Sequence, residues 1–107
     1  MDIPDSFPRL PHRAPDDTWP ASITRAHSLL ENGFNHARYA LRTSENDSHQ
    51  LRIHSNRIQT RMVPVLQALE RPNLAQRLDI QWTWNVTRIF GTLSLCLDEA
   101  ARAMDEM

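Results

Sequence analysis

Lysine is absent from this 107-residue chain, and cysteine and glycine are nearly absent. Cys96 has no partner for an intramolecular disulfide, which favours a reducing compartment. Two glycines are too few for a glycine-rich phosphate-binding loop. No apolar run approaches the roughly 20 residues that cross a bilayer, and the acidic, proline-rich N-terminus lacks the apolar segment of a signal peptide. We therefore expect an intracellular protein, cytoplasmic or nuclear, with no membrane partner.

The overall composition is that of one ordinary folded domain. Hydrophobic residues make up 40% of the chain and charged residues 23%, which is typical of a protein with a hydrophobic core. All twelve basic residues are arginine, and the formal net charge is −1. The chain as a whole is therefore not drawn to nucleic acid or to an anionic membrane.

Proline divides the chain into two parts. Five of the seven prolines lie in the first 20 residues, where they exclude a helix and favour extended or polyproline II structure. We predict a Pro-rich arm over residues 1–19, extended or partly docked, and a helical bundle over residues 20–107. Phe7 and Trp19 favour partial docking, because large aromatic side chains are costly to expose to water.

Apolar residues at intervals of three and four predict the first two helices. The first begins near Pro20, which suits a first helical turn, and ends around Thr43. The second follows a polar turn over residues 43–47. Its apolar stripe repeats like a heptad and contains Leu51, Ser55, Ile58, Met62, Val65 and Leu69. Pro64 lies inside this helix, so we expect a kink just before it or two shorter helices.

The third predicted helix runs from Asn73 to Met107 and carries the most apolar segment of the chain. Gly91 is its only weak helix former, so we expect no break. The complete prediction is an all-α, three-helix up-down-up bundle with a long C-terminal helix and a Pro-rich N-terminal arm. Equal rise per residue places Leu51 near Leu93 and Met62 near Trp82. It also leaves about ten residues of the third helix overhanging the second.

The third helix is the predicted partner-binding element. Trp84 and Leu95 fall outside its apolar stripes, and the predicted overhang carries Ala100, Met104 and Met107. Apolar surface without intrachain cover is typical of an interface. The leading hypothesis is a non-enzymatic protein-interaction module that forms a homodimer through Trp84 and the overhang. The competing account has the N-terminal arm fold back and cover Trp84 within one chain.

A nucleic-acid-binding function is the first alternative. The second helix holds Arg52, Arg57 and Arg61 and has no acidic residue between Ser48 and Leu69. Such a face can bind phosphates. A slightly acidic chain argues against this hypothesis, as does the spread of the three arginines over more than one face.

The arm supplies a second alternative, in which the protein is an adaptor. Phe7, Pro8, Leu10, Pro11 and Arg13 follow the order of apolar, proline and arginine residues that PxxP-binding domains recognise. The motif is short and common in Pro-rich segments, so it indicates this function only weakly.

Catalytic and metal-binding signatures are absent from the sequence. Cys96 lies on an apolar helical face, which hides a thiol from reactants. A third hypothesis is a small enzyme or ligand binder that brings His36, His54 and Glu31 into one pocket. The spacing of these residues matches no zinc motif. We therefore predict no metal site, no cofactor and no enzymatic activity.

Overall fold

The computed structural model describes residues 3–10, 21–43, 48–69 and 80–106. All the regular structure in these segments is helical, which confirms the all-α prediction. The elements are α1 (Ala21–Thr43), α2 (Ser48–Arg57), the π-helical turn η1 (Ile58–Met62), α3 (Val63–Leu69) and α4 (Ile80–Asp105). α2, η1 and α3 follow one another without a gap and form one continuous segment, here called the α2–α3 rod.

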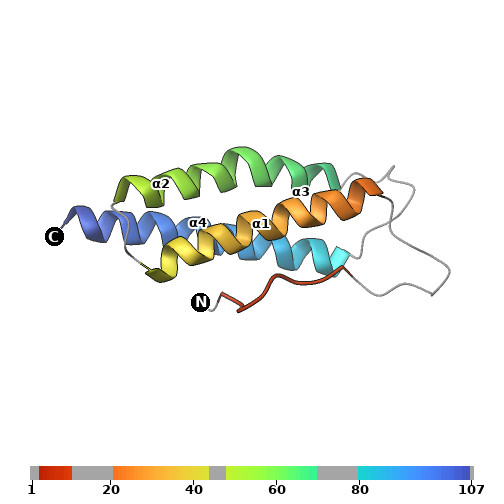
Figure 1. Ribbon diagram of the computed structural model, residues 1–107, viewed down its shortest axis with the longest axis horizontal. Coiled ribbons are helices and arrows are strands. Elements are labelled where there is room, and N and C mark those ends of the chain that lie inside the picture. The colour runs from red at the N-terminus through yellow and green to blue at the C-terminus, as the bar shows by residue number, and fades with distance from the viewer. Residues whose placement is uncertain (1–2, 11–20, 44–47, 70–79, 107) are drawn as a thin grey trace.

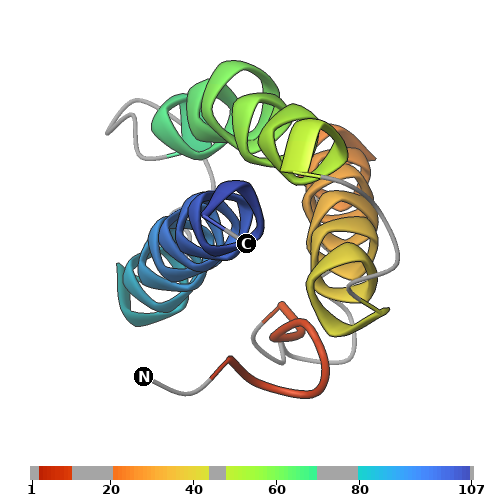
Figure 2. The same cartoon turned by 90° about the vertical axis from the view of Figure 1, so that its left-hand side faces the viewer.

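The molecule is elongated, with extents of 55 × 23 × 22 Å. α1, the α2–α3 rod and α4 lie side by side along its long axis (Figure 1). The view along this axis shows the three helical segments around a common core, with the N-terminal residues beside α1 and α4 (Figure 2). The predicted third helix is thus observed from Ile80 to Asp105 without a break at Gly91. Residues 73–79 of that prediction lie outside the described segments.

α1 matches its predicted limits and buries one face. Its core residues recur at intervals of three, four and seven, as expected for one side of a helix, and they are Ile23, Leu30, Phe34, Ala37 and Ala40. Gly33 lies beside this face. A Cβ on Gly33 would be 2.9 Å from the Sδ atom of Met62, so the missing side chain allows α1 to approach η1 closely.

A π-helical turn, and not a simple proline kink, precedes Pro64. The amide of Val63 bonds to the carbonyl oxygen of Ile58, five residues back. An α-helix would bring the Pro64 ring against the carbonyl of Thr60, four residues back. The wider π-helical turn ends at Met62, just before this proline. It therefore replaces the α-helical turn with which the ring of Pro64 is least compatible.

The π-helical turn also corrects the predicted apolar stripe. Each residue of a π-helix advances the chain through a smaller angle than in an α-helix. The rod downstream of Met62 is therefore rotated relative to a continuous α-helix. As a result Leu66 is buried, whereas Val65, the residue predicted for the core, is only half-buried.

Small polar residues set the register between the α2–α3 rod and α4. The Ser55 hydroxyl lies 3.0 Å from the Ser94 hydroxyl, and the Gln59 amide donates to Ser94 at 3.0 Å. Ser48, the first residue of α2, donates to Asp105, the last residue of α4. The rod and α4 therefore run in opposite directions, with Ser55 level with Ser94.

This register contradicts the predicted neighbours. Leu93 lies level with Ser55 to Ile58, and Leu51 lies more than one helical turn away from it. By the same register, Met62 lies level with the segment between Val86 and Phe90 and not with Trp82. The prediction assumed equal rise from an idealised turn. The hydroxyl groups of Ser55 and Ser94 are buried at the contact and bond to each other, and this pairing fixes a different alignment.

Residues 3–10 of the arm pack against the bundle. Phe7 is 4% exposed and belongs to the hydrophobic core, and Ile3 and Leu10 pack against that core. The Phe7 ring contacts rings from both α1 and α4, including Phe34 at 5.6 Å and Phe90 at 6.1 Å between centroids. This segment therefore fills the side of the core between α1 and α4 (Figure 2).

Candidate functional site

The outer face of α4 carries the most exposed tryptophan side chain among the described residues. Trp84 is 71% exposed and Leu95 is 52% exposed. Eleven residues make close to three helical turns, so both side chains lie on the same side of α4. Gly91 lies between them, and a Cβ at this position would have no atom within 4 Å. The outer face of α4 is thus apolar at two points and recessed at a glycine.

Charged residues flank these apolar positions, with different charges toward the two ends of the face. Arg88 is exposed one turn after Trp84 and donates to the Asn85 side chain at 2.9 Å. Glu99 and Arg102 are exposed on the C-terminal half of the same face. The face therefore presents a cation before Gly91 and an anion after Leu95.

The arm covers Trp82 and leaves Trp84 exposed. The Trp82 ring is 5% exposed, and its indole N–H donates to the Pro8 carbonyl oxygen at 3.2 Å. His27 also contacts that oxygen, at 3.2 Å from Nε2. Residues two apart on an α-helix point about 200° away from one another, so Trp84 lies away from this contact. The account in which the arm covers Trp84 is wrong for residues 3–10.

The predicted overhang of α4 is shorter than ten residues. Asp105 accepts hydrogen bonds from Ser48 at 2.5 Å and from Arg52 at 2.5 Å, so the start of α2 lies within side-chain reach of the end of α4. The C-terminal end of α4 projects past the start of α2 (Figure 1). Ala100 and Met104 are half-buried and pack on the core. Met107 lies outside the described residues.

The contacts at Asp105 change its charge behaviour. The hydrogen bond from Ser48, and then that from Arg52, lower the pKa of the Asp105 carboxyl below its usual value. Arg52 is thereby paired within its own chain. The acidic end of α4 is thus partly neutralised by α2 of the same chain.

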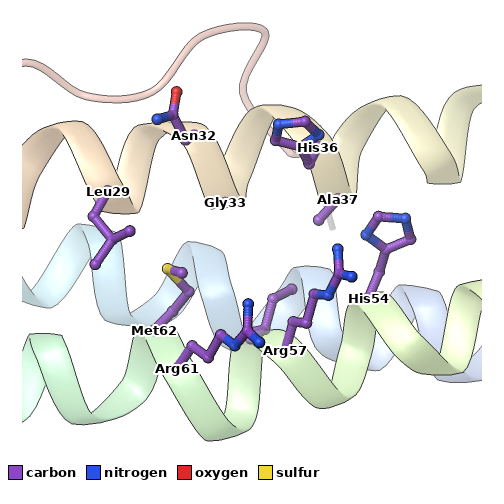
Figure 3. Close-up of a pocket in the computed structure, with 10 residues that line it drawn as sticks. Leu29, Asn32, Gly33, His36, Ala37, His54, Arg57, Arg61 and Met62 are labelled. Carbon is purple, nitrogen blue, oxygen red and sulfur yellow. The ribbon is translucent and has the colours of Figure 1, made fainter.

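A basic groove lies between α1 and the α2–α3 rod (Figure 3). Its basic side chains are His36 from α1, His54 and Arg57 from α2, and Arg61 from η1. Both arginine side chains extend toward α1 in Figure 3. Leu29, Asn32, Gly33, Ala37, Ile58 and Met62 complete the lining.

The groove contains some, but not all, of the residues named by two of the sequence hypotheses. It brings His36 and His54 together, as the ligand-binder hypothesis requires, but Glu31 is not among the described residues that line it. It contains Arg57 and Arg61, whereas Arg52 lies at the other end of α2 with Asp105. In the sequence, the spacing of four residues between Arg57 and Arg61 indicates that the two side chains point in a similar direction. The approach of His36 from α1 to His54 was part of the ligand-binder hypothesis.

Positive charge is concentrated in this groove. Burial, and then the neighbouring Arg57 and His36, lower the pKa of the His54 imidazole. None of the described residues that line the groove is acidic. His54 therefore resists protonation, because a proton there would be buried beside other cations.

The packing of Phe7 and Pro8 against the bundle argues against the PxxP hypothesis. Phe7 is buried and the Pro8 carbonyl is bonded to α4, so these residues would have to leave the bundle before another domain could bind them. Leu10 is also half-buried against the core. Pro11 and Arg13 lie outside the described residues.

Other chemistries find little support among the described residues. Cys96 is half-buried on α4. No cluster of three or more histidine, cysteine or carboxylate side chains in the described segments could hold a metal ion. None of the helices, as far as they are described, is both long and apolar enough to cross a membrane.

Comparison with protein-family models finds no matching family. Comparisons with curated proteins and with solved structures find no significant match either. The functional argument therefore rests on the surfaces described above.

Proposed function

We propose that this chain is a non-enzymatic protein-interaction module. In this proposal it is an up-down-up three-helix bundle with an N-terminal arm, and it self-associates through the outer face of α4. The observation that carries the proposal is the 71% exposure of Trp84 on a helix whose other faces are packed. Exposed tryptophans are enriched at the centres of protein interfaces.

A second copy of the chain is the partner that fits the order of residues on this face. A two-fold dimer requires that residue i contacts residue j and that j contacts i. In an antiparallel pair, a two-fold axis that crosses α4 at the level of Leu93 places Leu95 of each copy over Gly91 of the other. The open space at Gly91 supports such a close approach.

The charges on the face are complementary under the same two-fold axis. Arg88 of one copy lies opposite Glu99 of the other, and Trp84 lies opposite Arg102. Opposite charges across an interface favour the correct register, and an arginine over an indole ring is a favourable cation–π pair. The proposed interface thus uses two arginines, a glutamate, a tryptophan and a leucine from each copy.

The area available sets the expected strength. The stretch from Trp84 to Arg102 is about 27 Å long, and one helix face of this length offers less than the roughly 800 Å² per partner of a standard stable interface. We therefore expect a reversible dimer that dissociates on dilution. Ala100 and Met104 are not part of this interface, since both pack on the chain's own core.

The nucleic-acid alternative has less support. Arg52 is paired with Asp105, and the other two arginines share a groove with two histidines and do not line one extended face. A net charge of −1 adds no long-range attraction to phosphates.

Charge exchange across the two-fold axis is the test of the dimer. Sedimentation equilibrium should show wild-type dimers at high micromolar concentration. Arg88→Glu and Glu99→Arg should each weaken the dimer about five- to tenfold, because each places like charges opposite one another. The double variant should restore association. Arg9→Glu, a charge reversal on the exposed arm, is the matched control and should leave association unchanged.

Trp84→Ser should abolish association without unfolding the chain, because the side chain is exposed. Circular dichroism checks the fold of each variant. A wild-type protein that remains monomeric at high micromolar concentration contradicts the proposal. A charge-exchanged double variant that remains as weak as the single variants contradicts the proposed register.

A further inference from the structure

We propose that the basic groove between α1 and the α2–α3 rod binds a small phosphate-type dianion, such as a phosphomonoester group. The proposal concerns a different surface from the outer face of α4. It rests on the charges, the size and the construction of the groove.

The groove gathers hydrogen-bond donors from three successive elements. Arg57 and Arg61 enter from the rod, four residues apart, and their side chains extend toward α1 (Figure 3). Guanidinium groups bind phosphate oxygens through paired N–H donors, with stronger bonds than neutral donors form. The ring nitrogens of His36 and His54, which also line the groove, are further hydrogen-bonding groups.

Every titratable group that faces His54 in the groove is basic. His36 of α1 and Arg57 of α2 are the groups that act on it. Arg61 lines the groove further along η1, and no described lining residue is acidic. Burial, and then Arg57 and His36, lower the pKa of His54. A bound dianion would act in the opposite direction, because it attracts the proton that Arg57 repels.

The size of the groove limits what it can hold. Its volume is about 160 Å³, whereas sites for drug-sized ligands measure roughly 300–1,000 Å³. A tetrahedral oxyanion fits such a space and a nucleotide does not. Ile58 and Met62 close the floor with apolar atoms, so the anion contacts donors mainly from the two sides.

The local backbone explains why the groove is here. η1 interrupts the rod at Ile58–Met62, and single π-helical turns are frequent at functional sites. At Gly33 the absent side chain lets Met62 fill the contact between α1 and η1. The polar end of the groove opens beyond that contact, where His36 and His54 lie.

Calorimetric titration with inorganic phosphate and with sulfate tests the inference. Both ions should bind saturably. Arg57→Gln and Arg61→Gln should each weaken binding about tenfold, which is the usual effect of losing one charge-assisted hydrogen bond. Arg9→Gln, on the exposed arm, is the matched control and should bind as the wild type does.

The histidine signals give an independent readout. Nuclear magnetic resonance of the ring protons should show a rise in the pKa of His54 when sulfate binds, and no such rise in the Arg57→Gln, Arg61→Gln double variant. Sulfate stays a dianion over this pH range. Its affinity should therefore rise as pH falls through the titration of His54, and His54→Gln should remove most of that pH dependence.

Two probes separate a phosphomonoester from a nucleic acid backbone. Dimethyl phosphate, a singly charged diester, should bind at least about tenfold more weakly than inorganic phosphate, since it carries half the charge. Equal binding of the diester would overturn the assignment to a dianion. Absence of saturable binding, or binding that survives the double arginine substitution unchanged, would overturn the site itself.

Discussion

At the scale of single residues, the two glycines of the chain differ in what surrounds them. A Cβ on Gly33 would press on the flexible end of Met62, whereas a Cβ on Gly91 would meet open space. Both glycines lie inside α-helices, where glycine is less favourable than alanine. Gly33 is therefore explained by the packing of α1 on η1. Gly91 has no such reason within one chain, and its explanation belongs to the proposed dimer.

Gly91→Ala should stabilise the monomer by about 0.5–1 kcal/mol, because it gains helix propensity at no steric cost. Urea denaturation at low protein concentration measures the effect. Gly33→Ala is the matched comparison and should gain less or lose stability, since Met62 must move. Equal gains at both positions would contradict the close contact at Gly33.

Leu93→Ala should be among the most damaging single substitutions. Leu93 is fully buried in the core cluster, and removing a buried leucine side chain costs roughly 2–5 kcal/mol. The control is Leu95→Ala, two residues further on α4, where half the side chain is exposed. Denaturation of dilute monomer should show a loss for Leu95→Ala several times smaller than for Leu93→Ala.

At the scale of elements, the α2–α3 rod shows how one proline changes a helix beyond its own position. The proline position in the sequence predicted a disturbance near Thr60 to Pro64. The structure places a π-helical turn at Ile58–Met62, which rotates the following residues and buries Leu66. Neither a heptad count nor the presence of Pro64 specifies the size of this rotation, because it depends on which residue the core accepts.

Pro64→Ala should therefore change stability by less than about 1 kcal/mol. A proline in a regular helix interior costs about 3 kcal/mol, but the π-helical turn already relieves the clash and Pro64 itself is exposed. Chemical denaturation of the variant and the wild type gives the difference. A gain near the full cost of an interior proline would mean that the turn does not accommodate Pro64.

At the scale of the whole molecule, residues 3–10 of the arm contribute to the core. Phe7 lies edge-on to Trp82 with ring centroids 6.4 Å apart, and Arg38 of α1 forms a 2.8 Å ion pair with Asp5. The ion pair is exposed and contributes little. The burial of the Phe7 ring between α1 and α4 contributes most of the binding of this segment to the bundle.

Phe7→Ala should destabilise the whole bundle by about 3 kcal/mol, because a buried phenylalanine is replaced by a cavity. Arg9→Ala, two residues further along the same segment and exposed, should have almost no effect. Thermal denaturation followed by circular dichroism compares the two. Equal stability of both variants would show that residues 3–10 are dispensable for the fold.

The sequence by itself determined the helices and the residue that they leave uncovered. Apolar spacing of three and four positions predicted α1 to within about one residue and predicted an unbroken helix through Gly91, because helical periodicity is a local property of the chain. The same spacing left Trp84 outside both apolar stripes, and it is exposed. Its role in binding a partner stays a prediction.

Only the tertiary structure decided how these helices align. The pairing of Ser55 with Ser94 and of Ser48 with Asp105 shortened the predicted overhang. The packing of α1 beside the rod placed His36 with Arg57 and Arg61 in one groove. These contacts join residues distant in sequence, and they depend on small energy differences among side chains that meet only after folding. Helical periodicity contains no information about which turn of one helix lies beside which turn of another.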